Sequence, residues 1–125
     1  MQDYLYEELT YKLIGCAIEV HNTLGPGLLE KVYENSLMVL FQEKVIKAEQ
    51  QYPISIYFKE KLVGEYFADI LIEKKIILEL KAVESFCNAH IAQTLNYLKA
   101  TNLQLALLIN FGKNKLEYKR IINQR

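Results

Sequence analysis

Two acidic residues and a lysine lie within one short apolar stretch of this chain, residues 66–81. Two strand-length runs rich in Ile and Leu flank Glu73-Lys74-Lys75, a pattern that predicts an antiparallel hairpin with these residues as its loop. Such a hairpin places Asp69 opposite Glu79, where like charges are destabilising unless a cation compensates them. Glu79 and Lys81 are separated by one residue, so their side chains point to the same face of the strand.

These side chains are suited to phosphodiester cleavage that depends on a divalent metal ion. Mg²⁺ prefers oxygen ligands and is usually held by one or two carboxylates together with phosphate oxygens. We therefore expect Asp69 and Glu79 to bind Mg²⁺, with Mn²⁺ as the alternative ion, and Lys81 to activate a water or stabilise charge on the phosphate. The competing interpretation is a surface hairpin with solvated charges, because one D…ExK match is common in strand-rich chains.

The composition is that of an ordinary globular protein. The chain has 125 residues, 51% of them hydrophobic, and its 15 basic residues balance its 15 acidic ones. We expect a single domain over residues 1–125, and the balanced charge excludes a strongly basic nucleic-acid-binding domain. Only Arg120 and Arg125 are arginines, so base readout by bidentate arginine is nearly excluded. Any nucleic acid would be recognised mainly through its backbone and shape.

Cysteine content and the N-terminal sequence bear on the compartment. Cys16 and Cys87 are too few for a disulfide framework or a zinc cluster, which fits a reducing environment. Residues 1–4 are acidic and lack the basic flank of a signal peptide, and no apolar run approaches membrane-spanning length. We expect a cytoplasmic protein with no membrane partner.

Hydrophobic periodicity predicts the elements that must position the acidic residues. Helices are expected near 5–23, 28–44 and 88–101, and strands near 51–59, 62–72, 76–83, 103–111 and 115–122. The run 103–111 is nearly unbroken in its apolar character, which predicts a strand covered on both sides. This order, ααβββαββ, predicts an α/β (α+β) fold with a mixed central sheet flanked by helices. The stripes expected to be buried on the first two helices comprise Leu9, Leu13, Ile14, Ala17, Ile18 and His21, and Leu29, Val32, Tyr33, Leu37, Leu40 and Phe41.

Polar residues on the helix near 88–101 could join the site. His90, Gln93 and Tyr97 project on one side of this helix, which directly follows the strand bearing Lys81. Their amide and hydroxyl groups are suited to binding phosphate oxygens or orienting the lysine. The plain alternative is a polar helix face with a half-buried tyrosine.

Two further groups of residues have structural explanations of their own. Glu30 and Glu34 open the second helix, where acids favour the helix dipole whatever else they do. His21 and His90 could be ligands or proton carriers, but a hydrogen-bonded, half-buried histidine is the commoner outcome.

Taken together, these motifs resemble the GxxExxY proteins, a bacterial and archaeal group placed in the PD-(D/E)xK nuclease superfamily. The resemblance rests on Asp69 and on the runs 21–34, 77–83, 90–99 and 108–112, which span nearly the whole chain. It implies a restriction-endonuclease-like core. Ala68 stands where the superfamily name has proline, a position that varies widely in the superfamily.

The resemblance also implies roles for individual residues. It maps the acid of the first core helix onto Glu30, the metal-binding acids onto Asp69 and Glu79, and the superfamily lysine onto Lys81. The glutamine and tyrosine that some exonuclease-like branches carry on the second core helix correspond to Gln93 and Tyr97. The leading hypothesis is therefore a Mg²⁺-dependent nuclease that hydrolyses DNA phosphodiester bonds with a metal-activated water.

A second hypothesis is a non-catalytic, nuclease-fold module for binding or dimerisation within a larger nucleic-acid-processing assembly. Neutral net charge and scarce arginine favour affinity for nucleic acid shared with a homodimer subunit or a larger protein partner. An intact set of two acids and a lysine argues for catalysis instead. The choices between DNA and RNA, and between endonuclease and exonuclease, stay open at this point.

Overall fold

The computed structural model describes residues 5–124, so residues 1–4, used above to argue against a signal peptide, and Arg125 lie outside the described residues. The described elements follow in the order α1 (Glu7–Leu24), α2 (Glu30–Glu43), β1 (Ala48–Phe58), β2 (Lys61–Ile72), β3 (Ile76–Lys81), α3 (Asn88–Thr101), β4 (Leu105–Asn110) and β5 (Glu117–Ile122). This order confirms the predicted α+β class, and the predicted boundaries differ from the observed ones by a few residues.

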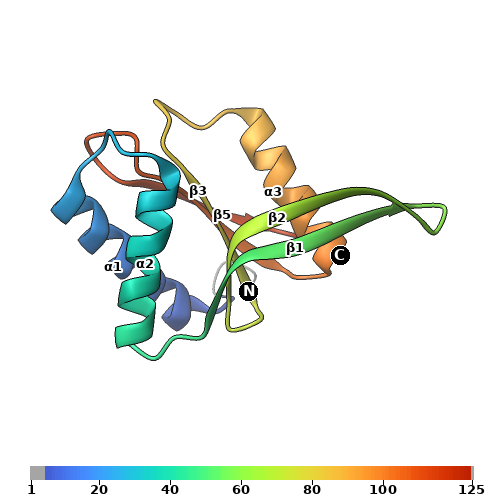
Figure 1. Ribbon diagram of the computed structural model, residues 1–125, viewed down its shortest axis with the longest axis horizontal. Coiled ribbons are helices and arrows are strands. Elements are labelled where there is room, and N and C mark those ends of the chain that lie inside the picture. Colours follow the sequence, from blue (N-terminus) through green and yellow to red (C-terminus); the bar gives the residue numbers. More distant parts are fainter. Residues whose placement is uncertain (1–4, 125) are drawn as a thin grey trace.

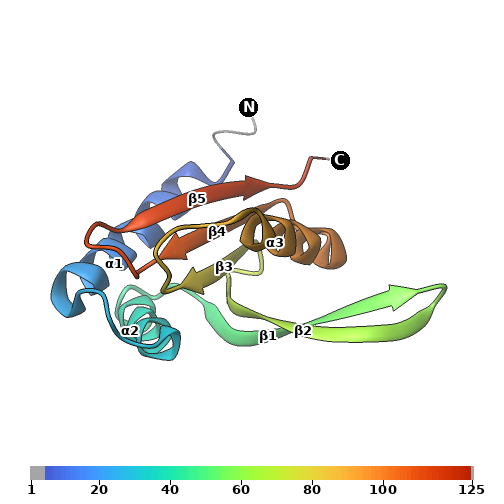
Figure 2. The ribbon, with the colours of Figure 1, turned by 90° about the horizontal axis from the view of Figure 1, so that it is seen from above.

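The strands form one mixed sheet with the spatial order β1-β2-β3-β4-β5. β3 and β4 are parallel, whereas the other neighbouring pairs are antiparallel. α3 is the crossover connection between the parallel strands, so the carboxyl ends of β3 and β4 lie at the same end of the sheet. α1 and α2 lie on one side of the sheet and α3 on the other (Figures 1 and 2).

Apolar side chains fill the space on both faces of the sheet. Along β3, Ile76, Leu78 and Leu80 belong to the core beneath α1 and α2, whereas Ile77 belongs to the core beneath α3. β4 is buried at every residue, which confirms the prediction of a strand covered on both sides. Because side chains alternate along a strand, Glu79 and Lys81 share the face of Ile77 and are directed to the α3 side.

The buried stripes of α1 and α2 differ from the predicted ones. Ile18 is 43% exposed, and Cys16 is buried in α1 instead. Leu29 precedes α2 and is 80% exposed, and Val32 is 40% exposed, whereas the polar Glu34 is buried. Apolar periodicity missed Glu34 because side chains of β1 satisfy its carboxylate, which a pattern within one helix does not register.

The loop between α1 and α2 is held by the tyrosine of the 21–34 run. The Tyr33 hydroxyl donates to the carbonyl oxygen of Gly25 at 2.7 Å and accepts from the backbone N–H of Leu28 at 3.1 Å. Gly25 and Gly27 have φ of 69° and 106°, values that glycine adopts at little cost. Tyr33 thus fixes the start of α2, and with it the position of Glu30.

β1 and β2 extend beyond the other strands as a two-stranded arm, which we call the β1–β2 arm (Figures 1 and 2). Its pairing continues to Phe58 and Lys61 and contains an irregularity between Ile56 and Tyr57. β1 contacts α3, and side chains of the arm and of α3 line a common groove. Within residues 5–124, no helix has the length and apolar character needed to cross a membrane.

Candidate functional site

Asp69 lies where the pairing of β2 is interrupted on both sides. The β2–β3 ladder extends only as far as Ile70 and Leu78, and one further step of the same register places Asp69 opposite Glu79. This register agrees with the predicted hairpin. On the other side, the β1–β2 pairing skips Gln51, which has φ of 51°. A positive φ outside glycine is uncommon and marks a strained or functional position.

Side-chain hydrogen bonds replace the missing backbone pairs. The backbone N–H of Asp69 donates to Glu79 Oε2 at 2.9 Å, and the backbone N–H of Leu80 donates to Asp69 Oδ2 at 2.7 Å. Each carboxylate therefore uses one oxygen to accept a backbone amide. No group in residues 5–124 donates to the second oxygen of either carboxylate. We call Asp69 and Glu79 the carboxylate pair, and its two remaining oxygens are available to a ligand.

The carboxylate pair is short of positive charge. Glu79 is 4% exposed. Burial, and then the charge of Asp69, raise its pKa to about 8. Burial also raises the pKa of Asp69, although the hydrogen bond from Leu80 acts in the opposite direction. Lys81 lowers both pKa values without cancelling these effects. Two carboxylates held together in a buried site are stabilised as charged groups by a bound cation.

We expect the metal-free protein to lose stability as the pH rises from about 5 to about 8. The pKa of folded Glu79, about 8, lies above its ordinary value of 4.5. Between these values the folded state holds a proton that the unfolded state has released, so stability is full below the ordinary pKa and falls as the pH rises. The slope is at most about 1.4 kcal/mol per pH unit for one proton. Urea unfolding in the presence of a chelator measures it. Glu79→Gln should flatten the slope, and an unchanged slope would contradict the raised pKa.

Lys81 and Glu30 lie at the carboxyl end of β3. Lys81 is half-buried, and its ammonium forms no ion pair with any residue from 5 to 124. Its charge nevertheless affects both members of the carboxylate pair, which places it close to them. Glu30, the first residue of α2, accepts a hydrogen bond at Oε2 from the backbone N–H of Ala82 at 3.2 Å. α2 thus brings a third carboxylate to the residue that follows Lys81.

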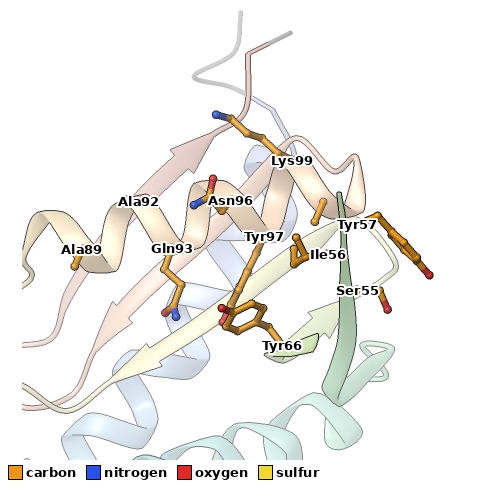
Figure 3. A pocket seen from close by; sticks show the side chains of 11 residues that line it. Ser55, Ile56, Tyr57, Tyr66, Ala89, Ala92, Gln93, Asn96, Tyr97 and Lys99 are labelled. Carbon is orange, nitrogen blue, oxygen red and sulfur yellow. The ribbon is translucent and has the colours of Figure 1, made fainter. Parts of the chain in front are cut away.

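α3 brings two of its three predicted residues to the same region. Tyr97 is 6% exposed. Burial, and then the charges of the carboxylate pair, raise its pKa to about 12. Gln93 and Tyr97 line a groove of about 820 Å³ and project from α3 (Figure 3). His90 instead accepts a hydrogen bond at Nδ1 from the backbone N–H of Cys87 at 3.2 Å, at the start of α3. His90 is not among the side chains that line the groove.

Glu34 is a buried acid that was not assigned to the site from sequence. It is 3% exposed and accepts hydrogen bonds from Lys31 at 3.1 Å, Gln50 at 2.7 Å and Gln51 at 3.1 Å. Its charge contributes to the raised pKa of Asp69. Through Gln51 it is connected to the interrupted part of β1. Its position one turn after the first acid of α2 is the sequence signal that could have drawn attention to it.

Asn110 holds the segment that follows Lys81. It is fully buried at the end of β4, and its Oδ1 accepts from the backbone N–H groups of Val83 at 3.0 Å and Gly112 at 2.9 Å. Its Nδ2 donates to the carbonyl oxygen of Val83 at 2.9 Å. A Cβ atom on Gly112 would lie 2.4 Å from the backbone nitrogen of Val83, so only glycine fits there. An asparagine that ends an apolar strand is the sequence signal for this clamp.

The site offers few protein ligands, so a metal ion bound there would take its remaining ligands from water and from the phosphate of a substrate. Among residues 5–124, no group of three or more His, Cys, Asp and Glu side chains could hold a metal ion. His21 is buried, and its Nε2 lies 2.7 Å from the carbonyl oxygen of Lys113, which supports packing rather than metal binding. A divalent ion that takes one or two carboxylates, waters and phosphate oxygens fits the carboxylate pair. The two free carboxylate oxygens and the uncompensated charge of the pair support this fit.

Comparisons with known proteins agree with this arrangement. A family model described as the PD-(D/E)XK nuclease superfamily matches residues 7–121. The crystal structure of SSO0001 superimposes with a TM-score of 0.60 at 19% identity, over 76% of this chain and 50% of that one. This chain therefore spans half the length of SSO0001. No curated protein sequence matches the chain.

A second solved structure is an alkaline exonuclease, LHK-Exo from Laribacter hongkongensis. It superimposes with a TM-score of 0.51 at 10% identity, over 86% of this chain and 76% of that one. At such low identity the two structures show the fold alone. The fold is restriction-endonuclease-like, which confirms the expectation drawn from the sequence.

Proposed function

The chain belongs to the PD-(D/E)XK nuclease superfamily, and from this membership we propose that it is a metal-dependent nuclease that hydrolyses phosphodiester bonds in DNA. Nucleases of this superfamily generally use divalent metal ions. We propose Mg²⁺ as the ion, with Mn²⁺ as a substitute, and a single catalytic domain that extends over the sequence. The runs 21–34 and 90–99 support placement in the GxxExxY group.

The observation that carries this proposal is the carboxylate pair beside Lys81. Each acid has one oxygen fixed by a backbone amide and one left free, and Lys81 does not cancel the effects that raise both pKa values at the buried Glu79 and the half-buried Asp69. A surface hairpin with solvated charges would not bury Glu79 to 4% exposure. The arrangement therefore favours the site over the simpler interpretation of the D…ExK pattern.

We assign a different role in phosphodiester hydrolysis to each residue of the site. Asp69 and Glu79 would hold a divalent ion, which when bound supplies Lewis-acid stabilisation of the phosphate and a lower pKa for water. The Lys81 ammonium stabilises negative charge as it develops on the phosphate oxygens or positions the attacking water. Glu30 has one oxygen fixed by the backbone N–H of Ala82, and its other oxygen would be available to a water at the end of β3.

Side chains of α3 would contact the substrate. Gln93 and Tyr97 can donate hydrogen bonds from the amide and the hydroxyl to phosphate oxygens next to the carboxylate pair. His90 is assigned to substrate binding as well, with its Nδ1 engaged in capping α3 and the opposite edge of its ring left for a contact. Because the chain contains only two arginines, we expect the protein to recognise the sugar-phosphate backbone of the nucleic acid rather than its base edges.

A cleavage assay tests the proposal directly. Purified protein is incubated with single-stranded, duplex and branched DNA and with single-stranded RNA, in Mg²⁺, in Mn²⁺ and in a chelator. We expect cleavage of DNA in either metal and none in the chelator. Absence of cleavage on every substrate, from a protein that still binds DNA, would favour the non-catalytic module. Cleavage of RNA alone would contradict the assignment of DNA as the substrate.

A further inference from the structure

A groove lies between α3 and the β1–β2 arm, beside the carboxylate pair. Its walls come from residues far apart in sequence, and Figure 3 shows Gln93 and Tyr97 of α3 projecting towards the side where Tyr66 of β2 lies. The rings of Tyr66 and Tyr97 are 5.8 Å apart between centroids. The volume of about 820 Å³ falls in the range of sites that take a small molecule, about 300 to 1,000 Å³, and suits flat bases rather than a duplex.

The lining of the groove is aromatic and uncharged. Among the described side chains that line it, Lys99 alone is charged, and Figure 3 shows it directed away from Tyr66 and Tyr97. A channel for the phosphate backbone is lined by many lysine and arginine side chains, because each neutralises a phosphate. Tyrosine rings beside small side chains instead offer stacking surfaces to bases. The groove therefore suits the bases of a strand whose phosphate lies at the carboxylate pair.

The surroundings of two tyrosine side chains indicate that this groove binds a ligand. Tyr97 is 6% exposed, and its hydroxyl makes no hydrogen bond to any residue between 5 and 124 although it lines the groove. Since no buried side-chain oxygen or nitrogen among the described residues lacks a partner, the hydroxyl itself reaches the surface of the groove, where a ligand can contact it. Tyr66 is 47% exposed although its ring lies against that of Tyr97, so part of the ring remains open to a ligand. The charges of the carboxylate pair also act on Tyr97, so the groove and the pair adjoin at this residue.

We propose that this groove binds an unpaired nucleobase, stacked on the exposed ring of Tyr66, and that the protein therefore acts on single-stranded or frayed nucleic acid. The proposal rests on the proposed nuclease function and specifies its substrate class. A paired base cannot enter the groove without leaving its stack. Selection of single strands thus follows from the shape of the groove and requires no arginine contact to base edges.

Binding to strands with and without bases tests the proposal. Fluorescence anisotropy at high salt measures the affinity for a short oligothymidylate, for the same strand made abasic and for a duplex of equal length. Lys81→Ala is the background for all of these measurements, with Mg²⁺ present, so that cleavage does not consume the probe. We expect the abasic strand to bind roughly 5- to 150-fold more weakly than oligothymidylate, the range for stacking of one base. High salt suppresses the phosphate contacts that both strands share.

Substitutions at Tyr66 assign this difference to the groove. Tyr66→Ala and Tyr66→Leu should abolish the preference for bases without changing the affinity for the abasic strand, whereas Tyr66→Phe should retain it. Tyr66→Leu keeps apolar bulk against Tyr97, so it still tests stacking if the alanine variant unfolds. Tyr118→Ala is the matched control, because Tyr118 is 49% exposed on β5 and does not line the groove. An oligouridylate arm shows whether the base comes from DNA or RNA.

Three results would overturn the proposal. The first is equal affinity for normal and abasic strands, and the second is a preference for bases that survives Tyr66→Ala and Tyr66→Leu. The third is a change from dimer to monomer in sedimentation with Tyr66→Ala, without any stacking, which would make the groove an interface between two copies. The proposed function fails separately: if the parent protein cleaves nothing but shows base-dependent binding, the groove stands and the nuclease assignment does not.

Discussion

Replacing Lys81 with alanine should slow DNA cleavage about 10²- to 10³-fold, the usual cost of removing one group that stabilises transition-state charge. The fold should persist, because the Lys81 ammonium pairs with no acid within residues 5–124 and lies at the end of β3, outside the apolar core. Circular dichroism and thermal melts compare folding of parent and variant. Initial cleavage rates on the best DNA substrate, in saturating metal, measure the catalytic effect.

Two matched variants make the Lys81 result interpretable. Lys81→Met keeps the apolar stem without the charge, so it should be as slow as the alanine variant if the ammonium is the active group. Lys12→Ala removes an exposed lysine from α1 and should leave the rate unchanged. Full activity of Lys81→Ala in a preparation free of other nucleases would refute the catalytic assignment of this residue.

Replacing Asp69 with asparagine should leave the metal-free protein at neutral pH as stable as the parent or more stable. The change removes the Asp69 carboxylate, whose charge is disfavoured by burial and raises the pKa of Glu79, and the asparagine side-chain oxygen can still accept the hydrogen bond from Leu80. The same change removes a metal ligand. A ligand that binds only the folded state stabilises it by about 2.7 kcal/mol at a concentration 100 times its Kd, so the parent should gain this stability and the variant should lose most of it.

Thermal melts across a titration of Mg²⁺ or Mn²⁺, with and without DNA, measure this difference. Glu65→Gln is the control, because Glu65 is an exposed acid on the same strand as Asp69. The control should melt and respond to metal like the parent protein. A parent protein whose melting temperature does not change with metal up to millimolar concentrations, even with DNA present, would show that the carboxylate pair binds no ion and would favour the non-catalytic module.

The local pattern of the sequence was sufficient to predict the elements and the pairing that underlie the site. The two strand-length runs rich in Ile and Leu that flank Glu73-Lys74-Lys75 predicted the β2–β3 hairpin, and its observed register sets Asp69 opposite Glu79. The apolar run before Asn110 predicted a strand buried on both faces. These features depend on side-chain direction and chain length over a few residues, so a short window of sequence contains the information.

The contacts between distant segments were decided by the tertiary structure. Glu34 was expected to be a dipole-favouring acid of α2, yet it is buried because two glutamines of β1 donate to it. Leu29 and Val32 were expected in the core and are exposed, because the face of α2 that meets the sheet includes Glu34. Helical periodicity registers apolarity within one helix, and it contains no information about which polar partners another element supplies.

The groove between α3 and the β1–β2 arm could not be predicted from local sequence patterns either. Tyr66 and Tyr97 lie on different elements, and nothing in their sequence separation indicates that their rings meet at 5.8 Å beside the carboxylate pair. Residue type and strand alternation fix charge and side-chain direction, so the candidate catalytic residues can be identified from the sequence. Only the packing of α3 against the sheet and the β1–β2 arm decided how deeply the acids are buried, which raises their pKa values, and formed the space in which a substrate can lie.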